Sequence, residues 1–147
     1  MSASITIQAA ADFLRDHDGY LILTHLRPDG DTVGCAAALC RALRQLGKRA
    51  FVLPNPQASS LFTPYFEGLL AEDGFAPDTV VSVDIAARGL FPDNAQKYLP
   101  RVDLAIDHHP SQEFFAQRTC LDAGRAACGE LMYDILRLLG PVTGDIA

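Results

Sequence analysis

The sequence has no hydrophobic run long enough to cross a membrane. A membrane-spanning helix needs about 20 consecutive apolar residues, and no stretch of this chain approaches that length. The first residues, MSASITIQAAADFLRDHDGY, carry neither a basic segment nor a long apolar segment, so they are not typical of a secretory signal peptide. We therefore expect a soluble, cytoplasmic protein without a membrane partner.

Positive charge is also scarce. The chain has 12 Lys and Arg against 18 Asp and Glu, a formal net charge of −6. General binding to nucleic acid needs a clustered Lys and Arg surface, so the composition argues against that class of partner. A small phosphorylated substrate remains compatible with it, because bound metal ions could supply the local positive charge.

Cysteine pairs with metal-binding or redox spacing are absent. The four cysteines are Cys35, Cys40, Cys120 and Cys128. They form no CxxC pair and no zinc-binding spacing. We expect them to be buried free thiols in a reducing cytoplasm.

Short apolar runs alternate with helical patterns along the chain. The runs predict strands over residues 20–24, 49–53, 79–83 and 102–106, and an edge strand over 118–121. The patterns predict helices over 5–17, 32–46, 88–99 and 125–139, with a shorter one within 61–70. Such alternation predicts an α/β fold of three layers, a parallel sheet with helices on both faces. In this class ligands bind beyond the carboxyl ends of the strands.

The loop after the first predicted strand is rich in metal-binding side chains. It reads His25-Leu26-Arg27-Pro28-Asp29-Gly30-Asp31. Gly30 permits a tight turn that could bring both carboxylates toward one point. In the alternative interpretation, Asp31 caps the next helix and Asp29 only shapes a turn.

Two further predicted strands also end in acidic or histidine residues. Asp84 follows one strand, and Asp107, His108 and His109 follow another. Taken singly, Asp84 could begin a turn and the histidines could be a structural pair. Taken with the first loop, so many carboxylates at one edge would repel each other unless cations lay among them. Mixed carboxylate and imidazole ligands favour Mn²⁺ or a related ion, and a two-metal site needs a bridging carboxylate.

Three segments resemble the first three motifs of the DHH phosphoesterases. They read THLRPDGDTVG, VVSVDIA and IDHHP, and the later stretch DAGRAACGELMYDIL resembles the helix that follows the third motif. This superfamily includes RecJ-like exonucleases, oligoribonuclease/pAp phosphatases, cyclic-di-AMP phosphodiesterases and family II pyrophosphatases. The resemblance implies that residues 1–147 form an amino-terminal DHH catalytic domain.

The resemblance also implies five ligands for two divalent metal ions, with Mn²⁺ preferred and Mg²⁺ as the alternative. His25 and Asp29 would bind one ion, and Asp31 and His108 the other. Asp84 would bridge the two. A water held between the ions would be deprotonated near neutral pH and would attack phosphorus in line.

Two more residues would assist the chemistry. By the same resemblance, His109 faces the substrate phosphate near the leaving oxygen, and Asp107 orients a histidine. The implied function is a phosphoesterase of the oligoribonuclease/pAp phosphatase type, acting on short RNA or DNA oligonucleotides or on 3′,5′-bisphosphate nucleotides. Hydrolysis of cyclic-di-AMP or pApA is the nearest alternative. A homo-oligomer is compatible with all of these.

The chain departs from the family pattern at its carboxyl end. A fourth-motif aspartate, which binds the second metal, and a carboxyl-terminal substrate-binding domain are expected but absent, and Asp145 comes too early to be that aspartate. The expectation is an incomplete catalytic domain with reduced or no turnover. A non-catalytic metal- or nucleotide-binding fragment is therefore an alternative. A doubly wound nucleotide-binding domain with coincidental acids is disfavoured, because no glycine-rich fingerprint follows the first strand.

Overall fold

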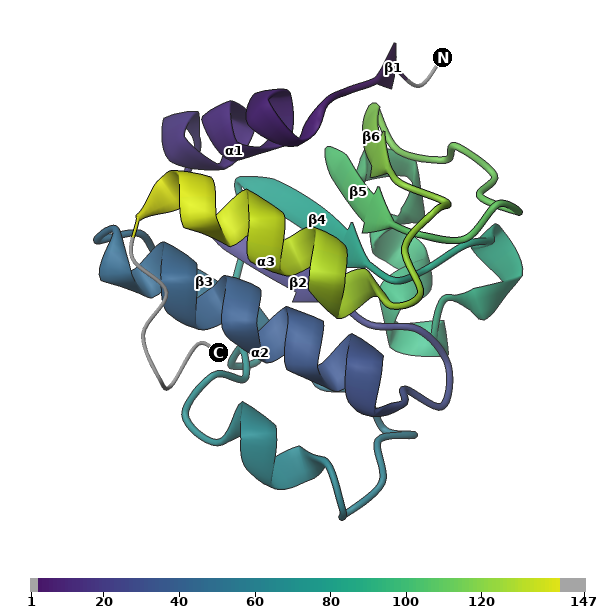
Figure 1. Cartoon of the computed structure of the whole chain (residues 1–147). Helices are drawn as coiled ribbons and strands as arrows, with labels where there is room; N and C mark the ends of the chain where they lie inside the picture. The colour runs from purple at the N-terminus through teal and green to yellow at the C-terminus, as the bar shows by residue number, and fades with distance from the viewer. Residues whose placement is uncertain (1–2, 141–147) are drawn as a thin grey trace.

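A six-stranded parallel sheet forms the middle layer of the fold (Figure 1). The computed structural model describes residues 3–140. In spatial order the strands are β1 (Ala3–Ser4), β6 (Arg118–Leu121), β5 (Leu104–Asp107), β4 (Thr79–Val83), β2 (Tyr20–Leu23) and β3 (Ala50–Val52). Every pairing is parallel, so the carboxyl ends of all strands lie at one edge of the sheet.

Three α-helices cover one face of the sheet (Figure 1). They are α1 (Ile7–Asp16), α2 (Gly30–Gln45) and α3 (Cys128–Leu139). Leu39 and Leu131 from these helices share one buried cluster with Ile22 and Ile106 of the sheet, and burial of such apolar side chains is the main force that holds the layers together. Among residues 3–140, no helix has both the length and the hydrophobicity needed to cross a membrane.

The opposite face is covered by 3₁₀ helices rather than by an α-helix. The predicted helix over residues 88–99 is wrong in type, since the chain forms η2 (Arg88–Leu90) and η3 (Asp93–Arg101). Pro92 separates the two segments, because a proline offers no backbone N–H to a continuous α-helix. Phe91 and Ala95 pack with Leu21 of the sheet in a second buried cluster. The predicted three-layer α/β architecture is confirmed.

The predicted strands are confirmed with small shifts in their bounds, but one strand was missed. Residues 118–121 form β6 as predicted, yet β6 is not an edge strand, because β1 pairs with it. The amide of Ile5 donates to the carbonyl of Thr119 at 2.9 Å beyond this short pairing. The predicted helix within residues 61–70 is the four-residue 3₁₀ helix η1 (Thr63–Phe66).

The four cysteines are free and buried, as predicted. Cys40 Sγ donates to the carbonyl of Ala50 at 3.3 Å, and burial raises the pKa of the Cys40 thiol to about 11. A buried thiol with a raised pKa is a structural side chain rather than a reactive one.

The chain changes direction between β2 and β4, which are neighbours in the sheet. From β2 the chain passes through α2 on one face to reach β3, whereas from β4 it passes through η2 and η3 on the other face to reach β5. The two connections therefore diverge at the carboxyl ends of β2 and β4, the place where open α/β sheets bind ligands.

Candidate metal centre

The loops after three neighbouring strands bring the predicted ligands together. The loop after β2 carries His25 and Asp29, and Asp31 lies in the first turn of α2. The loop after β4 begins with Asp84, and β5 leads into His108 and His109. Asp84 lies in the middle: its carboxylate is 3.8 Å from His25 Nε2, 3.1 Å from His108 Nε2 and 3.7 Å from His109 Nδ1. The structure thus places these side chains at one site, as the sequence predicts.

Asp84 is a buried carboxylate with one unsatisfied oxygen. Its side chain is only 3% exposed. Oδ2 accepts a hydrogen bond from the Thr32 hydroxyl at 2.7 Å, but Oδ1 has no hydrogen-bond donor. Burial, and next the charge of Asp31, raise the pKa of the Asp84 carboxyl. A buried carboxylate oxygen without a donor is costly, and a bound cation would relieve that cost.

His25 and His108 are held in the same manner. His25 Nδ1 lies 2.6 Å from the carbonyl of Leu26, and His108 Nδ1 lies 3.1 Å from the carbonyl of Arg125. A carbonyl beside Nδ1 fixes the ring proton there and leaves a lone pair on Nε2. Both Nε2 atoms face Asp84, so lone pairs on nitrogen and oxygen point at each other. This is the donor arrangement of a metal site.

The groups around His108 change the pKa of its ring in opposite directions. Partial burial opposes protonation of this ring. The hydrogen bond to the carbonyl of Arg125 and the carboxylate of Asp84 outweigh it, so the pKa of His108 is raised above the usual value for histidine. The field around this ring therefore favours positive charge.

Thr32 marks the first of two candidate metal positions. Its buried hydroxyl lies 2.7 Å from His25 Nε2, 3.0 Å from Asp29 Oδ1 and 2.7 Å from Asp84 Oδ2. A hydroxyl has one proton to donate, so three acceptors converge on a single donor. The ligand atoms of His25, Asp29 and Asp84 lie within 4.8 Å of one another, which is a suitable arrangement for a metal ion.

Asp29, rather than Asp31, caps α2. The amide of Thr32 donates to Asp29 Oδ1 at 2.9 Å, the N-cap bond that the sequence left to Asp31 in its alternative interpretation. Asp29 still faces the first metal position, so capping and metal binding are compatible at this residue.

Asp31 joins α2 to the amino end of α3. Its Oδ2 accepts from the amide of Cys128 and its Oδ1 from the amide of Gly129, both at 2.9 Å. A Cβ added at Gly129 would lie 3.3 Å from Asp31 Oδ1, so glycine allows this close approach. Asp31 Oδ2 also lies 3.9 Å from His108 Nε2. This places Asp31 beside the second candidate position, and its ligation of a metal stays a prediction.

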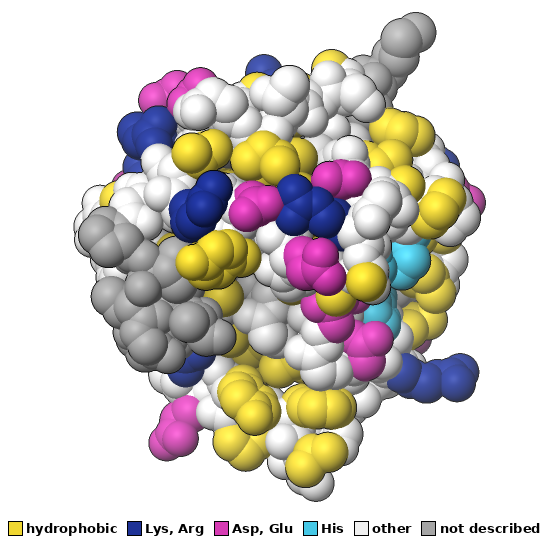
Figure 2. All heavy atoms as spheres, viewed as in Figure 1, with side chains coloured by type: hydrophobic (Ala, Val, Ile, Leu, Met, Phe, Trp, Pro, Cys, Tyr) yellow, Lys and Arg dark blue, Asp and Glu magenta, His cyan; other side chains and the backbone are white. Residues whose placement is uncertain are grey.

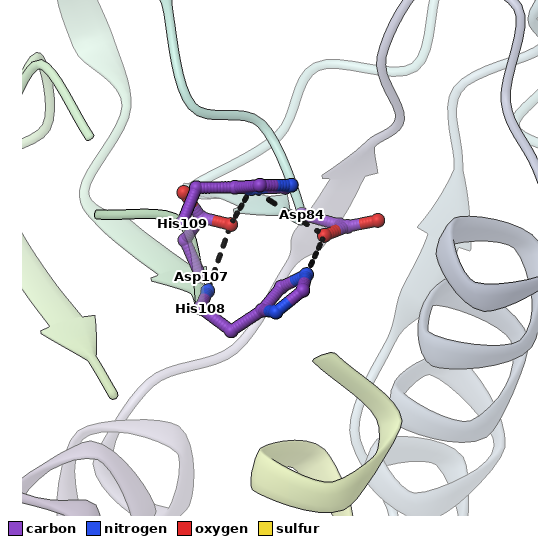
Figure 3. A group of neighbouring side chains, drawn as sticks. All are labelled: Asp84, Asp107, His108 and His109. Atoms are coloured by element: carbon purple, nitrogen blue, oxygen red, sulfur yellow. Dashed lines mark hydrogen bonds and ion pairs between the residues drawn. The ribbon is translucent and has the colours of Figure 1, made fainter. Parts of the chain in front are cut away.

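Asp107 holds His109 (Figure 3). Asp107 Oδ1 accepts from His109 Nδ1 at 2.6 Å and from the amide of His108 at 2.8 Å. Its Oδ2 accepts from Gln112 Nε2 at 2.8 Å. Asp107 belongs to a group with Asp84, His108 and His109 that could bind a metal, but its Oδ1 already accepts two hydrogen bonds, one of them from the His109 ring, and its Oδ2 a third. The geometry fits the predicted role of orienting a histidine better than that of a ligand.

Two contributing residues were not predicted from the sequence. Besides Thr32, the buried side chain of Gln112 donates to the carbonyl of Ile85 at 3.0 Å as well as to Asp107. It therefore ties the loop after β4 to the loop after β5. The only sequence signal for Thr32 is its place just after the two aspartates of the first loop, and Gln112 has no comparable signal.

Residues 20–144 match the family described as DHH family, N-terminal domain. The chain belongs to the DHH family. The match includes all seven predicted site residues, and it confirms the resemblance inferred from the three sequence motifs.

Curated relatives of this DHH domain share one description, bifunctional oligoribonuclease and PAP phosphatase NrnA. The relative from Thermus thermophilus is 30% identical over 148 residues, which cover 91% of this chain and 41% of that protein. The relative from Bacillus subtilis is 25% identical over 122 residues, which cover 81% of this chain and 38% of that protein. The DHH domain thus spans about two fifths of the length of the relatives it matches.

Solved structures support the fold. An exopolyphosphatase-related protein from Bacteroides fragilis superposes with a TM-score of 0.75 at 21% identity, over 91% of this chain and 43% of that one. CDC45 from Entamoeba histolytica superposes with a TM-score of 0.54 at 15% identity, over 97% of this chain and 32% of that one. At these identities the similarity establishes the shared fold of the DHH domain.

Burial of Asp84 predicts how the stability of the metal-free DHH domain depends on pH. Because the folded-state pKa of Asp84 is raised, its contribution to stability is present below the unfolded-state pKa and is lost as the pH rises through the folded-state pKa. Asp84→Asn removes that charge. With a chelator present at neutral pH, we expect the variant to be more stable than the wild type by about 1 kcal/mol.

Thermal unfolding at mildly acidic and at neutral pH measures this difference. The advantage of Asp84→Asn should grow from acidic to neutral pH and amount to a few degrees in Tm. Comparison of the two proteins at each pH cancels the titration of all other groups. A variant that melts no higher than the wild type at neutral pH would show that the Asp84 carboxylate is not destabilised by its burial.

Proposed function

We propose that this DHH domain is the catalytic domain of a metal-dependent phosphoesterase that hydrolyses short oligonucleotides or 3′,5′-bisphosphate nucleotides such as pAp. The observation that carries the proposal is the buried carboxylate of Asp84, which faces His25 Nε2 on one side and His108 Nε2 on the other. The substrate class is supported by the description of the curated relatives as oligoribonucleases and PAP phosphatases.

Two divalent ions fit the donor atoms of the site. His25, Asp29 and Asp84 would hold one ion, and Asp84, His108 and Asp31 the other. Ligands of imidazole nitrogen and carboxylate oxygen suit Mn²⁺, with Mg²⁺ as the harder alternative. When bound, such ions lower the pKa of a water molecule and neutralise charge on the phosphate.

His109 is the residue best placed to bind the substrate phosphate. Asp107 accepts from its Nδ1 and fixes the orientation of the ring, while the ring itself is 38% exposed. Its Nε2 is therefore the free position, available to a phosphate oxygen or to the leaving oxygen. This is the geometry of a positioned general acid, with Asp107 and Gln112 holding the ring in place.

Hydrolysis assays with the 147-residue chain test the proposal. Loaded with Mn²⁺, the protein should release phosphate from pAp and AMP from short RNA, and a chelator should stop both reactions. Asp16→Asn is the matched control for substitutions of the site carboxylates and should keep full activity. Asp16 is an exposed carboxylate at the end of α1, before the amino end of β2. A protein that binds two Mn²⁺ ions but releases no product from pAp, pApA or RNA would contradict the proposal. A marked preference for pApA or cyclic-di-AMP would favour the alternative substrates.

A second candidate function is a non-catalytic domain that binds metal or nucleotide. It is favoured by one observation, that both oxygens of Asp31 already accept hydrogen bonds from the amides of Cys128 and Gly129, which leaves fewer lone pairs for a second ion. Counting bound Mn²⁺ separates the candidates: two ions with turnover support the enzyme, and one ion without turnover supports the binding domain.

A further inference from the structure

A cavity of about 180 Å³ lies between α2 and the segment around η1, next to the metal centre. Its lining residues are Gly30, Val33, Gly34, Phe62 and Tyr65. None of these side chains is charged. Gly30 is the residue that joins Asp29 and Asp31, so the cavity begins one residue away from two predicted metal ligands.

The shape of the cavity follows from two glycines one helical turn apart. A Cβ added at Gly30 would lie 3.4 Å from the ring of Phe62, whereas a Cβ added at Gly34 would meet no atom within 4 Å. Phe62 therefore packs over the backbone at Gly30, and open space remains over the bare backbone at Gly34. With the exposed ring of Tyr65 beside it, this space suits a flat aromatic group.

The segment that carries the two aromatic rings is anchored to α2. Arg41 Nη2 donates to the carbonyl of Tyr65 at 3.3 Å, and Arg44 Nη1 donates to the carbonyl of Gly68 at 2.8 Å. Phe66, between them, is buried in the main core. The cavity is thus formed before any ligand arrives, and binding to it needs little ordering of the chain.

Size and charge restrict what the cavity can hold. Pockets that enclose a whole small ligand usually measure about 300–1,000 Å³, so this one has room for only part of a nucleotide. Its uncharged walls disfavour a phosphate group and favour a base. Hydrophobic side chains gather over the η1 segment, on the same face of the molecule as the acidic and histidine side chains near the amino ends of α2 and α3 (Figure 2). The η1 segment and the metal centre therefore lie on one face, and Gly30 in the cavity wall directly joins Asp29 and Asp31.

We infer that this cavity binds the nucleobase of a nucleotide whose phosphate lies at the metal centre. The inference rests on the proposed function, which puts the phosphate there. Stacking on Tyr65 and Phe62 accepts any base, because every base has an aromatic face. The cavity would thus select nucleotides over phosphoesters that lack a base, without selecting a sequence.

Binding of AMP and of ribose 5-phosphate to the Mn²⁺-loaded protein tests the inference. Calorimetry should show tighter binding of AMP, and Tyr65→Ala should weaken AMP binding about 10-fold, the loss of one stacking contact. Binding of ribose 5-phosphate should stay the same. Tyr133→Ala is the matched control, because Tyr133 is an exposed tyrosine on α3 that does not line the cavity, and it should change neither affinity.

A second variant separates binding from folding. Gly34→Leu fills the cavity with a side chain that favours the helix, so it should weaken AMP binding without loss of stability. Equal affinities of the wild type for AMP and ribose 5-phosphate would overturn the inference, because they would show that the cavity does not bind the base. Selective AMP binding that depends on Tyr65, in a protein without turnover, would refute the proposed function but not this inference.

Discussion

Asp84→Asn is expected to reduce hydrolysis of pAp at least about 10³-fold and to abolish tight binding of both Mn²⁺ ions. Within residues 3–140, Asp84 is the side chain whose two oxygens face both histidine Nε2 atoms, Oδ2 toward His25 and Oδ1 toward His108. Loss of its charge therefore weakens both positions, whereas loss of a ligand such as His25 should weaken one. Phosphate release and Mn²⁺ titration on the same samples measure the two effects.

The substitution by asparagine keeps the backbone of Asp84 intact. Asp84 has a φ of 61°, a left-handed conformation that asparagine tolerates and that alanine would strain. An inactive Asp84→Asn protein that also melts above the metal-free wild type cannot be explained by misfolding. Retention of two Mn²⁺ ions with full activity in this variant would show that Asp84 does not bridge the two ions.

His109→Gln is expected to lower kcat for pAp by about 10²–10⁴-fold, the usual contribution of a positioned acid or base. Its ring is held by Asp107 through Nδ1, and we assign Nε2 to the substrate rather than to a metal. Binding of Mn²⁺ should therefore be unchanged. This combination distinguishes His109 from His108, whose Nε2 faces Asp84 and whose replacement should remove an ion.

Stopped assays at saturating pAp, together with Mn²⁺ titration, measure both parts of this prediction. His17→Gln is the matched control, because His17 is an exposed histidine just before β2, at the opposite edge of the sheet. It should change neither kcat nor metal binding. Loss of one Mn²⁺ ion in His109→Gln would instead make His109 a ligand.

Much of the fold could be predicted because each buried strand is a short apolar run. Segments such as Tyr20–Leu23 and Thr79–Val83 are buried on both faces of the sheet, and this produces the continuous hydrophobic pattern of parallel strands. The two-residue strand β1 has no such pattern, since its residues are exposed. It forms only because the backbone of β6 offers free hydrogen-bonding groups nearby.

The position of the site could be predicted for the same reason, but its internal contacts could not. Parallel strands place their carboxyl ends at one edge, so Asp84 and His108 had to lie near the loop that follows β2. Thr32 gains its role only when three acceptors converge on its hydroxyl, and Gln112 only when two loops approach each other. Such contacts depend on tertiary packing, which local sequence patterns do not predict.

The bridging role of Asp84 is the central claim, and electron paramagnetic resonance of the protein with two equivalents of Mn²⁺ tests it most directly. Two ions that share one carboxylate are magnetically coupled, so the wild type should give the spectrum of a coupled pair, and Asp84→Asn should lose it. A wild-type spectrum of isolated Mn²⁺ ions at full occupancy would contradict the shared site.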